Sequence, residues 1–186
     1  MDPVCFLDMD GVVCDFTKGA LAVHKTIIPP LEIKWDFWKK IGCTEQEFWS
    51  PFNREFWSNL EWTVEGKEIL DAVESLFRDN IVLVTSPCET EGCVEGKRDW
   101  VSKHLPSYTR RLMIGPCKHL LAGKGKLLID DSSDNINKFG LFGGNVLTVS
   151  RPWNDLSDEV DEKGCCNVGV FIYRMGVVYR QMESGG

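Results

Sequence analysis

The stretch Val4-Cys5-Phe6-Leu7-Asp8-Met9-Asp10-Gly11-Val12 decides the expected fold. Its opening run, residues 4–7, is continuously apolar, which is typical of a strand buried on both faces of a parallel sheet. Asp8 ends this run and Asp10 follows two residues later, so two carboxylates stand where a buried strand ends. Gly11 allows a sharp backbone turn beside a ligand. The D-x-D-G pattern also occurs in calcium-binding loops, so alone it leaves both a solvated turn and a catalytic loop open.

Further apolar runs have the length of strands and alternate with amphipathic stretches. The runs cover residues 81–84, 111–114, 127–129 and 145–149. The amphipathic stretches cover residues 66–77, 95–105 and 133–139, and the first of them repeats its apolar residues with a helical period. Alternating strands and helices predict an α/β fold with a Rossmann-like parallel sheet covered on both faces.

More than sixty residues separate the first two strand runs, which is too many for one crossover helix. Thr44 to Glu47 has the spacing of a helix capping box. Aromatic residues crowd this segment, namely Trp35, Phe37, Trp38, Phe48, Trp49, Phe52, Phe56, Trp57 and Trp62. We expect residues 15–64 to form a small helical cap domain, with residues 1–14 and 65–186 forming the core. Most of these aromatic side chains are expected to fill the cap's own interior.

Polar residues follow the strand runs directly. Thr85 and Ser86 end the second run, and Asp130 and Asp131 end the fourth, while Lys118 follows the third. Ligands of open parallel sheets bind outside the carboxyl ends of the strands, so we expect these side chains to converge with Asp8 and Asp10 on one rim. Taken one at a time, the Thr-Ser pair reads as a turn or cap, the lysine as a surface residue, and the acid pair as an N-cap.

Together these residues have the chemistry of a phosphoryl-transfer site. At the strand end, Asp8 can attack phosphorus, and Asp10 can serve as general acid and base. Hydroxyl and amide groups at Thr85 and Ser86 can hold phosphoryl oxygens, and Lys118 can neutralise their charge. Adjacent buried carboxylates need a partner, and Mg²⁺ bound through oxygen ligands suits a phosphate site.

The order D-x-D-G, Thr-Ser, Lys, Asp-Asp resembles the haloacid dehalogenase (HAD) superfamily of phosphohydrolases over roughly residues 4–150. Residues 8–13 with Asp15 and Phe16, the run 84–87 and the run 128–131 resemble the 5′(3′)-deoxyribonucleotidases more closely. The resemblance implies a HAD-type core and hydrolysis of (deoxy)ribonucleoside monophosphates through an aspartyl-phosphate on Asp8.

The same resemblance assigns individual site residues. Mg²⁺ would be bound by Asp8, the backbone carbonyl of Asp10, and Asp131, with Asp130 binding it too or orienting its water shell or Lys118. The base would lie among cap aromatics, and Lys97 would lie near the substrate. The aromatic positions that match the family are Phe16, Phe37, Trp38 and Trp49. A base preference does not follow, because residues 88–96 are acidic where the family is basic and aromatic.

Charge and composition restrict the partners. The formal net charge of −7 disfavours a nucleic-acid polymer, whose binding depends on Lys and Arg, but allows a small phosphate monoester. No apolar run is long enough for a membrane span and no signal-peptide pattern begins the chain, so we expect a cytoplasmic protein without membrane contacts. The eight cysteines are expected to be reduced thiols. A zinc site built from Cys88, Cys93, Cys117 and His119 is the alternative.

Other interpretations stay open at this point. The same chemistry would serve a HAD-type phosphatase acting on a sugar phosphate, and a nucleotide- or metal-binding module without turnover would use the same residues. Residues 167–181 look like a β-hairpin turning near Met175 and Gly176. Its apolar residues could supply a homodimer interface, and they are Val168, Val170, Ile172, Val177 and Val178.

Overall fold

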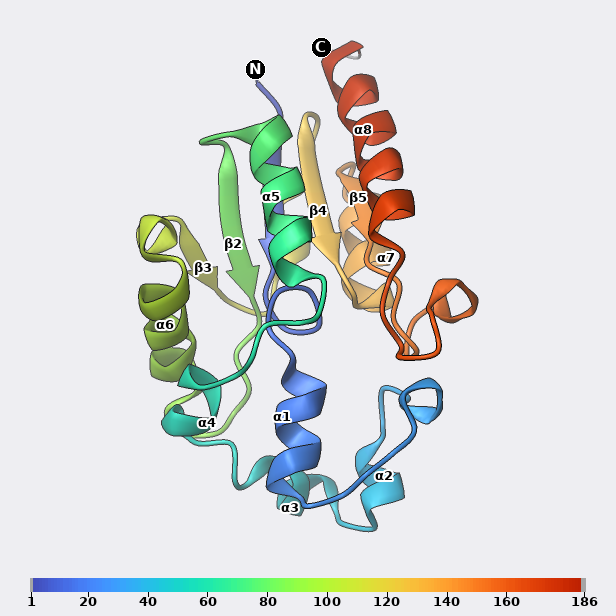
Figure 1. Cartoon of the computed structure of the whole chain (residues 1–186). Helices are drawn as coiled ribbons and strands as arrows, with labels where there is room; N and C mark the ends of the chain where they lie inside the picture. Colours follow the sequence, from blue (N-terminus) through green and yellow to red (C-terminus); the bar gives the residue numbers. More distant parts are fainter. Residues whose placement is uncertain (1, 185–186) are drawn as a thin grey trace.

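A computed structural model describes residues 2–184, and its centre is a parallel five-stranded sheet (Figure 1). The strands are β1 (Val4–Asp8), β2 (Ile81–Thr85), β3 (Leu112–Ile114), β4 (Lys126–Asp130) and β5 (Asn145–Thr148). Their order is β3-β2-β1-β4-β5, and every neighbouring pair is parallel. All five predicted strands are therefore confirmed to within about a residue at each end. Because β1 lies between β2 and β4, the three strand ends that carry polar residues are adjacent.

Helices cover the sheet as predicted. The larger ones are α5 (Gly66–Phe77), α6 (Cys93–His104), α7 (Ser133–Leu141) and α8 (Val168–Ser184). Short 3₁₀ helices also occur, namely η2 (Pro106–Tyr108), η3 (Lys118–Leu121) and η4 (Ser157–Glu159). In Figure 1, α5 and α8 lie in front of the sheet and α7 lies behind β5. The three predicted core helices are confirmed, and α5 has the predicted bounds.

The C-terminal segment is a helix, and the prediction of a β-hairpin at residues 167–181 was wrong. Its buried residues Phe171, Met175 and Met182 are spaced by four and seven positions, so they form one helical stripe. This stripe packs on α5 and β5, where Tyr179 meets Phe77 edge to face at 5.0 Å. Tertiary packing thus overrides the local alternation of valines that favoured a strand. Neither α8 nor any other helix within residues 2–184 is long and apolar enough to cross a membrane.

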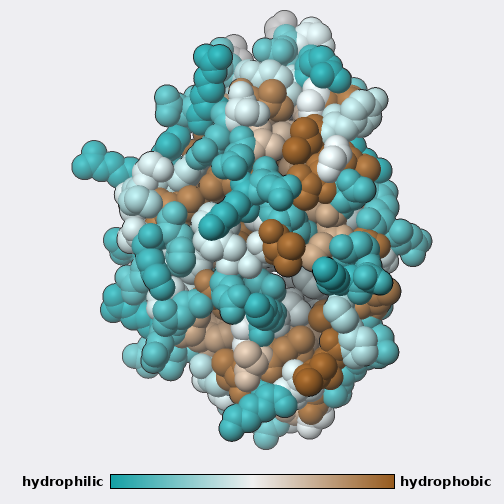
Figure 2. All heavy atoms as spheres, in the orientation of Figure 1, coloured by the Kyte–Doolittle hydropathy of each residue, from teal (hydrophilic) through white to brown (hydrophobic). Residues whose placement is uncertain are grey.

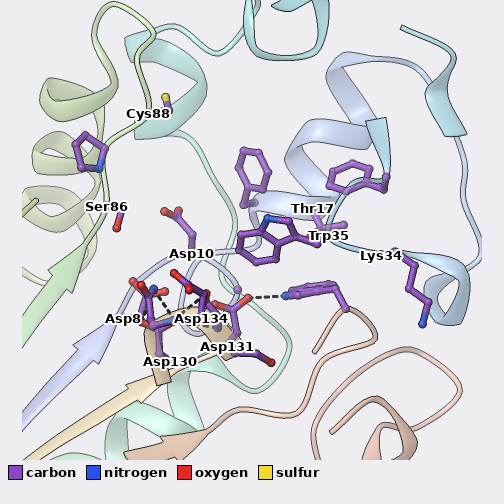
Figure 3. Close-up of a pocket in the computed structure, with 18 of the residues that line it drawn as sticks. Asp8, Asp10, Thr17, Lys34, Trp35, Ser86, Cys88, Asp130, Asp131 and Asp134 are labelled. Carbon is purple, nitrogen blue, oxygen red and sulfur yellow. Dashed lines mark hydrogen bonds between the residues drawn. The ribbon is translucent and has the colours of Figure 1, made fainter. Parts of the chain in front are cut away.

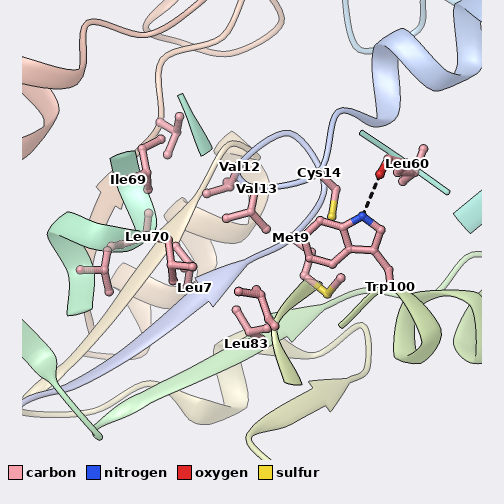
Figure 4. Packing of buried hydrophobic residues seen from close by; sticks show 14 of the residues in the cluster. Leu7, Met9, Val12, Val13, Cys14, Leu60, Ile69, Leu70, Leu83 and Trp100 are labelled. Atoms are coloured by element: carbon pink, nitrogen blue, oxygen red, sulfur yellow. Dashed lines mark hydrogen bonds between the residues drawn. The ribbon is translucent and has the colours of Figure 1, made fainter. Parts of the chain in front are cut away.

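Alternate residues of β1 build two hydrophobic clusters, one on each face of the sheet. Leu7 is fully buried among Ile69 and Leu70 of α5, Leu83 of β2 and residues of the following loop (Figure 4). Phe6 points to the other face and meets Phe139 of α7 at 6.1 Å. The strand is therefore held from both sides, which fixes the position of Asp8 at its end.

The segment between β1 and α5 lies beyond the carboxyl end of the sheet (Figure 1). It contains α1 (Phe16–Val23), η1 (Pro30–Glu32), α2 (Trp38–Ile41), α3 (Glu45–Trp49) and α4 (Arg54–Ser58). The predicted capping box begins α3, where Thr44 and Glu47 exchange side-chain-to-backbone hydrogen bonds. Hydrophobic side chains on the face shown in Figure 2 gather in its lower part, over this segment. This is the segment that was predicted to form the cap, and it is called the cap below.

The cap shares its hydrophobic interior with the core. Helix α4 packs on α6, and a Cβ atom added at Gly96 of α6 would lie 2.6 Å from the Cβ atom of Trp57. Phe48, Phe52 and Trp57 belong to the same buried cluster as Leu7 and Trp100. The division at residues 14/15 and 64/65 stays a prediction, and Met1, Gly185 and Gly186 of the predicted core lie outside the described residues.

Candidate active site

Three acidic side chains meet at the carboxyl end of the sheet (Figure 3). Asp8 ends β1, Asp130 ends β4 and Asp131 follows it, and one oxygen from each lies within 4.8 Å of the others. All three are buried. The rim predicted from the strand ends thus brings these residues together.

Lys118 joins this acid group from the first residue of η3. Its Nζ donates to Asp8 Oδ1 at 2.5 Å and to Asp130 Oδ2 at 2.7 Å. Burial works to lower the pKa of Lys118, but the two carboxylates outweigh it and raise the pKa, so the ammonium stays charged. These four buried side chains are one ammonium group and three carboxyl groups, so negative charge is in excess when the acids are ionised.

Burial and this excess of negative charge both act on the pKa values of the acids. Burial raises the pKa of Asp8 well above its ordinary value, against the opposing influence of Lys118. Burial and the neighbouring Asp130 raise the pKa of Asp131 to about 7. A divalent cation would relieve the repulsion, and an all-oxygen set of hard ligands fits Mg²⁺.

Asp10 lies beside this group and is held by different partners. Its Oδ2 accepts hydrogen bonds from Lys97 Nζ and, at 3.2 Å, from the Thr85 hydroxyl. Lys97, which is buried, also donates to Thr85 Oγ1 at 2.7 Å and to the Ser86 carbonyl at 2.8 Å. The other oxygen, Asp10 Oδ1, is buried without a hydrogen-bond partner among the described residues.

This arrangement separates the predicted phosphate-binding residues. Thr85 is fully buried behind Asp10 and Lys97, whereas Ser86 lines the cavity above the acids. The ammonium group of Lys97, predicted near the substrate, is directed to Asp10.

Gly11 allows the loop after β1 to lie close against the loop after β4. Its φ is +74°, and a Cβ atom there would lie 2.3 Å from Asp131 Oδ2. Both the left-handed backbone and the missing side chain are therefore required at this position.

A cavity of about 700 Å³ opens above the acids toward the cap. All four predicted aromatic positions line it, namely Phe16, Phe37, Trp38 and Trp49. Phe16 lies between Trp49 and Trp57, with ring centroids 5.7 and 5.4 Å away. Trp35 lines the same cavity and is 62% exposed, so its ring is open to a ligand.

The sequence analysis missed several residues of this site. Trp35 and Trp57 were grouped with the aromatics of the cap interior, and residues 150–156, directly after β5, were given no role. Trp153 in that segment donates its indole N–H to Asp131 Oδ2 at 2.7 Å, and Asn154 donates to the Asp131 carbonyl at 2.8 Å. The signal was present, because this polar segment follows a fifth parallel strand and must lie near the same rim.

The alternative zinc site does not form. Within residues 2–184, the group of metal-ligating side chains that comes together is Asp8, Asp130 and Asp131. The eight cysteines are free thiols, as predicted.

Comparisons with known proteins agree with the resemblance. The family model described as "5′ nucleotidase, deoxy (Pyrimidine), cytosolic type C protein" matches residues 2–159. The chain belongs to this family. The 5′ nucleotidase family model thus spans the acids of β1 and β4, both lysines and the whole cap.

Relatives of this nucleotidase-family chain include two mammalian proteins. The mitochondrial 5′(3′)-deoxyribonucleotidase of Mus musculus is 27% identical over 142 residues, which cover 69% of this chain and 64% of that protein. The Homo sapiens protein of the same name is also 27% identical over 142 residues, covering 69% and 61%. The chain therefore spans less than two thirds of the length of either relative.

Solved structures are similar at lower identity. A dehalogenase has a TM-score of 0.46 and 12% identity, with 82% of this chain and 87% of that chain covered. A HAD family enzyme from Bacteroides thetaiotaomicron has a TM-score of 0.43 and 14% identity, with 84% and 97% covered.

Proposed function

We propose that this protein is a Mg²⁺-dependent hydrolase that converts (deoxy)ribonucleoside monophosphates to nucleoside and phosphate through an aspartyl-phosphate on Asp8. One observation carries the proposal. In a nucleotidase-family chain, the Asp8 carboxylate lies beside Lys118 and the Asp130–Asp131 pair, at the base of a cavity walled by aromatic rings.

In the first step, an oxygen of Asp8 attacks phosphorus in line with the departing nucleoside oxygen. Oδ1 of Asp8 is bonded to Lys118, so Oδ2, which accepts no hydrogen bond from residues 2–184, is the oxygen that attacks. As the P–O bond to the nucleoside breaks, Asp10, which lines the cavity, delivers a proton to the leaving oxygen. Lys118 and the Ser86 hydroxyl stabilise the negative charge on the phosphoryl oxygens.

In the second step, Asp10, now ionised, removes a proton from water. The hydroxide attacks phosphorus, the Asp8–phosphorus bond breaks, and phosphate leaves. Lys97 and Thr85 hold Asp10 Oδ2, so the carboxylate keeps one orientation through both steps. Asp10 loses one proton in the first step and regains one in the second, so the cycle balances.

Mg²⁺ would be bound by Asp8, the Asp10 carbonyl and Asp131, with Asp130 beside them. Asp130 already accepts hydrogen bonds from Lys118, Asn135 and the Ser132 amide, which suits it to orient Lys118. When bound, the ion supplies positive charge that offsets the phosphate and the carboxylates.

The aromatic cavity supports a nucleoside as the leaving group. Base–aromatic stacking contributes about 1–3 kcal/mol per base. The aromatic residues that match the family's base-binding positions all line the cavity, and they are Phe16, Phe37, Trp38 and Trp49. Trp35 offers a further exposed ring. A sugar phosphate would leave most of this apolar wall without a partner.

The decisive variant is Asp8→Asn. The neutral amide cannot attack phosphorus, so turnover should be abolished while folding and the melting temperature stay near those of the wild type. Near-normal phosphate release by this variant would show that Asp8 is not the nucleophile. Trapping with beryllium fluoride provides an independent check, because the adduct should form on wild-type Asp8 and not on the variant.

A substrate panel tests the specificity. With Mg²⁺, thymidine and uridine deoxymonophosphates should be hydrolysed with a higher kcat/KM than phosphorylated sugars. The reverse order would favour the sugar-phosphate phosphatase. Absence of any phosphate release, even from an aryl phosphate, would favour a binding module. We further infer a small-molecule substrate and not a nucleic-acid polymer from the net charge of −7, and a cytoplasmic location and a homodimer stay predictions.

A further inference from the structure

The segment Arg151–Asp155 connects three parts of the molecule that meet at the site. Arg151 Nε donates to the Gly11 carbonyl at 2.6 Å, and Trp153 Nε1 donates to Asp131 Oδ2 at 2.7 Å. The carbonyl of Pro152 accepts a hydrogen bond from Lys34 Nζ of the cap at 3.0 Å. This segment therefore touches the β1 loop, the β4 loop and the cap at once.

Asp131 depends on Trp153 for its orientation. Among the described residues, Trp153 is the donor that reaches the Asp131 carboxylate, whereas Asp130 accepts hydrogen bonds from three other residues. On its other side, Asp131 Oδ2 is packed so close to Gly11 that a Cβ atom would not fit. Oδ2 is thus fixed between the indole N–H and the Gly11 backbone, which leaves Oδ1 as the oxygen free to bind a cation.

Trp153 is itself held in place by buried hydrogen bonds. The Asn154 side chain donates to the backbone carbonyls of Asp131 and Val149 at 2.8 and 2.7 Å. The backbone N–H of Asn154 donates to the Arg151 carbonyl at 3.2 Å, which closes a turn around Trp153. Arg151 is anchored by Glu65 at 2.5 Å. An indole on such a fixed turn can hold a carboxylate in one rotamer.

We propose that Trp153 is a positioning residue whose indole N–H fixes Asp131 and thereby sets the affinity of the site for Mg²⁺. The inference rests on the proposed function, because that function supplies the cation. An alternative role for Trp153 is that of cavity wall only, since its ring lines the same cavity. These roles differ in a measurable way, because a wall residue changes nucleotide binding and leaves metal binding alone.

The test measures Mg²⁺ binding in the absence of nucleotide. Trp153→Phe keeps an aromatic ring and removes the N–H. Loss of a residue that hydrogen-bonds to a metal ligand typically weakens metal affinity by about 10–100-fold. Trp62→Phe is the matched control, because Trp62 is also half-buried, also donates its indole N–H (to His104 at 3.4 Å), and does not line the cavity. Isothermal titration calorimetry should show affinity weakened about 10-fold or more for Trp153→Phe and within about twofold of wild type for the control.

Thermal melting with and without Mg²⁺ gives a second readout. Because a ligand that binds only the folded state raises Tm, the Mg²⁺-induced rise should be smaller for Trp153→Phe than for wild type and Trp62→Phe. A second pair of variants tests the same N–H group if the phenylalanine variant folds poorly. Trp153→Gln keeps an N–H donor of similar reach and Trp153→Leu does not, so the glutamine variant should bind Mg²⁺ more tightly than the leucine variant.

The possible outcomes separate the two proposals. If wild type binds Mg²⁺ and Trp153→Phe binds it equally well, Trp153 is not a positioning residue, while the proposed function stands. If the glutamine and leucine variants have equal affinity, the N–H is not the cause and the inference fails. If wild type itself binds no Mg²⁺, the metal dependence in the proposed function fails and this inference fails with it.

Discussion

The Asp10 carboxylate is held by fixed partners and still lines the cavity, which suits this residue to both halves of a hydrolytic cycle. Oδ2 is bonded to the Lys97 ammonium and the Thr85 hydroxyl, so this edge of the carboxylate does not rotate freely. Oδ1 has no partner within residues 2–184. The Asp10 side chain is nevertheless 27% exposed and lines the cavity, so a leaving oxygen or a water can reach the carboxylate.

Asp10→Asn tests this at the residue scale. General acid–base catalysis contributes about 10²–10⁴-fold, so kcat for a nucleoside monophosphate should fall by about that factor. The loss should be smaller for p-nitrophenyl phosphate, whose leaving group needs little protonation, when both rates are measured as single-turnover phosphate release. Asp79→Asn, at a fully exposed acid, is the control and should match the wild type. Equal losses on both substrates would argue against proton donation by Asp10.

Gly11 leads to a second prediction at this scale. Gly11→Ala places a Cβ atom against Asp131 Oδ2 and forces an alanine into a backbone conformation at φ +74° that it rarely adopts. Activity should fall at least about tenfold, because Asp131 must move, and stability should fall by about 1–2 kcal/mol. Gly42→Ala is the control, since Gly42 has φ +81° but open space around it. If both variants lost activity equally, backbone strain alone would explain the effect.

At the scale of elements, the sheet was predictable because its strands are buried on both faces and read as continuous apolar runs. Their order puts Asp8 between Thr85 and Asp130, so the acid group followed from topology. Two features were not predictable in this way. The helix α8 carries the stripe of Phe171, Met175 and Met182, whose helical period is visible only when a partner such as α5 is known.

The segment after β5 was missed for a different reason. Its contributions are a hydrogen bond from Trp153, one from Asn154 and a buried ion pair of Arg151, and each is a common residue in a loop. The local sequence pattern gives no information on which loop residues find buried partners 22 to 86 positions away. The cap aromatics posed the same problem, because filling an interior and lining a cavity require the same residue types.

The buried pair of Arg151 and Glu65 gives the element-scale prediction. Glu65 is the N-cap residue of α5, and Arg151 follows β5. Both side chains are about 96% buried, with Arg151 Nη1 and Glu65 Oε1 at 2.5 Å. Glu65→Gln leaves the guanidinium without a counter-charge, so the free energy of unfolding in urea should fall by about 3–5 kcal/mol near neutral pH. Glu61→Gln is the control, because its pair with Lys18 is exposed and should contribute less than about 1 kcal/mol.

The pH dependence of this difference follows from the pKa of Glu65. Burial works to raise that pKa, but Arg151 and the Cys166 amide outweigh it and hold the pKa below its ordinary value. The ionised pair therefore stabilises the fold fully above the ordinary glutamate pKa. This contribution is lost as the pH falls through the lowered folded-state value. The gap between wild type and Glu65→Gln should narrow only in that acidic range, and a gap independent of pH would indicate a packing defect instead.

At the scale of the whole molecule, the cavity is closed on one side by the core and on the other by the cap. Helix α4 packs firmly on α6, but the part of the cap that carries Trp35 and Trp38 is linked to the core more lightly. The hydrogen bond from Lys34 Nζ to the Pro152 carbonyl, at 3.0 Å, joins this part to the segment that holds Trp153. Its position beside Trp35 indicates that it fixes where the aromatic wall stands relative to the acids.

Lys34→Met should therefore weaken nucleotide binding more than it slows the chemical step. Losing a hydrogen bond from a charged but exposed donor should raise KM for a nucleoside monophosphate by about three- to tenfold, with kcat within about twofold of wild type. Lys40→Met is the control, because Lys40 is bonded to Glu32 within the cap itself. The KM for a small aryl phosphate, which does not reach the aromatic wall, should not change. If that KM rose equally, Lys34 would act by attracting the phosphate charge, and the link between cap and core would not be what positions the substrate.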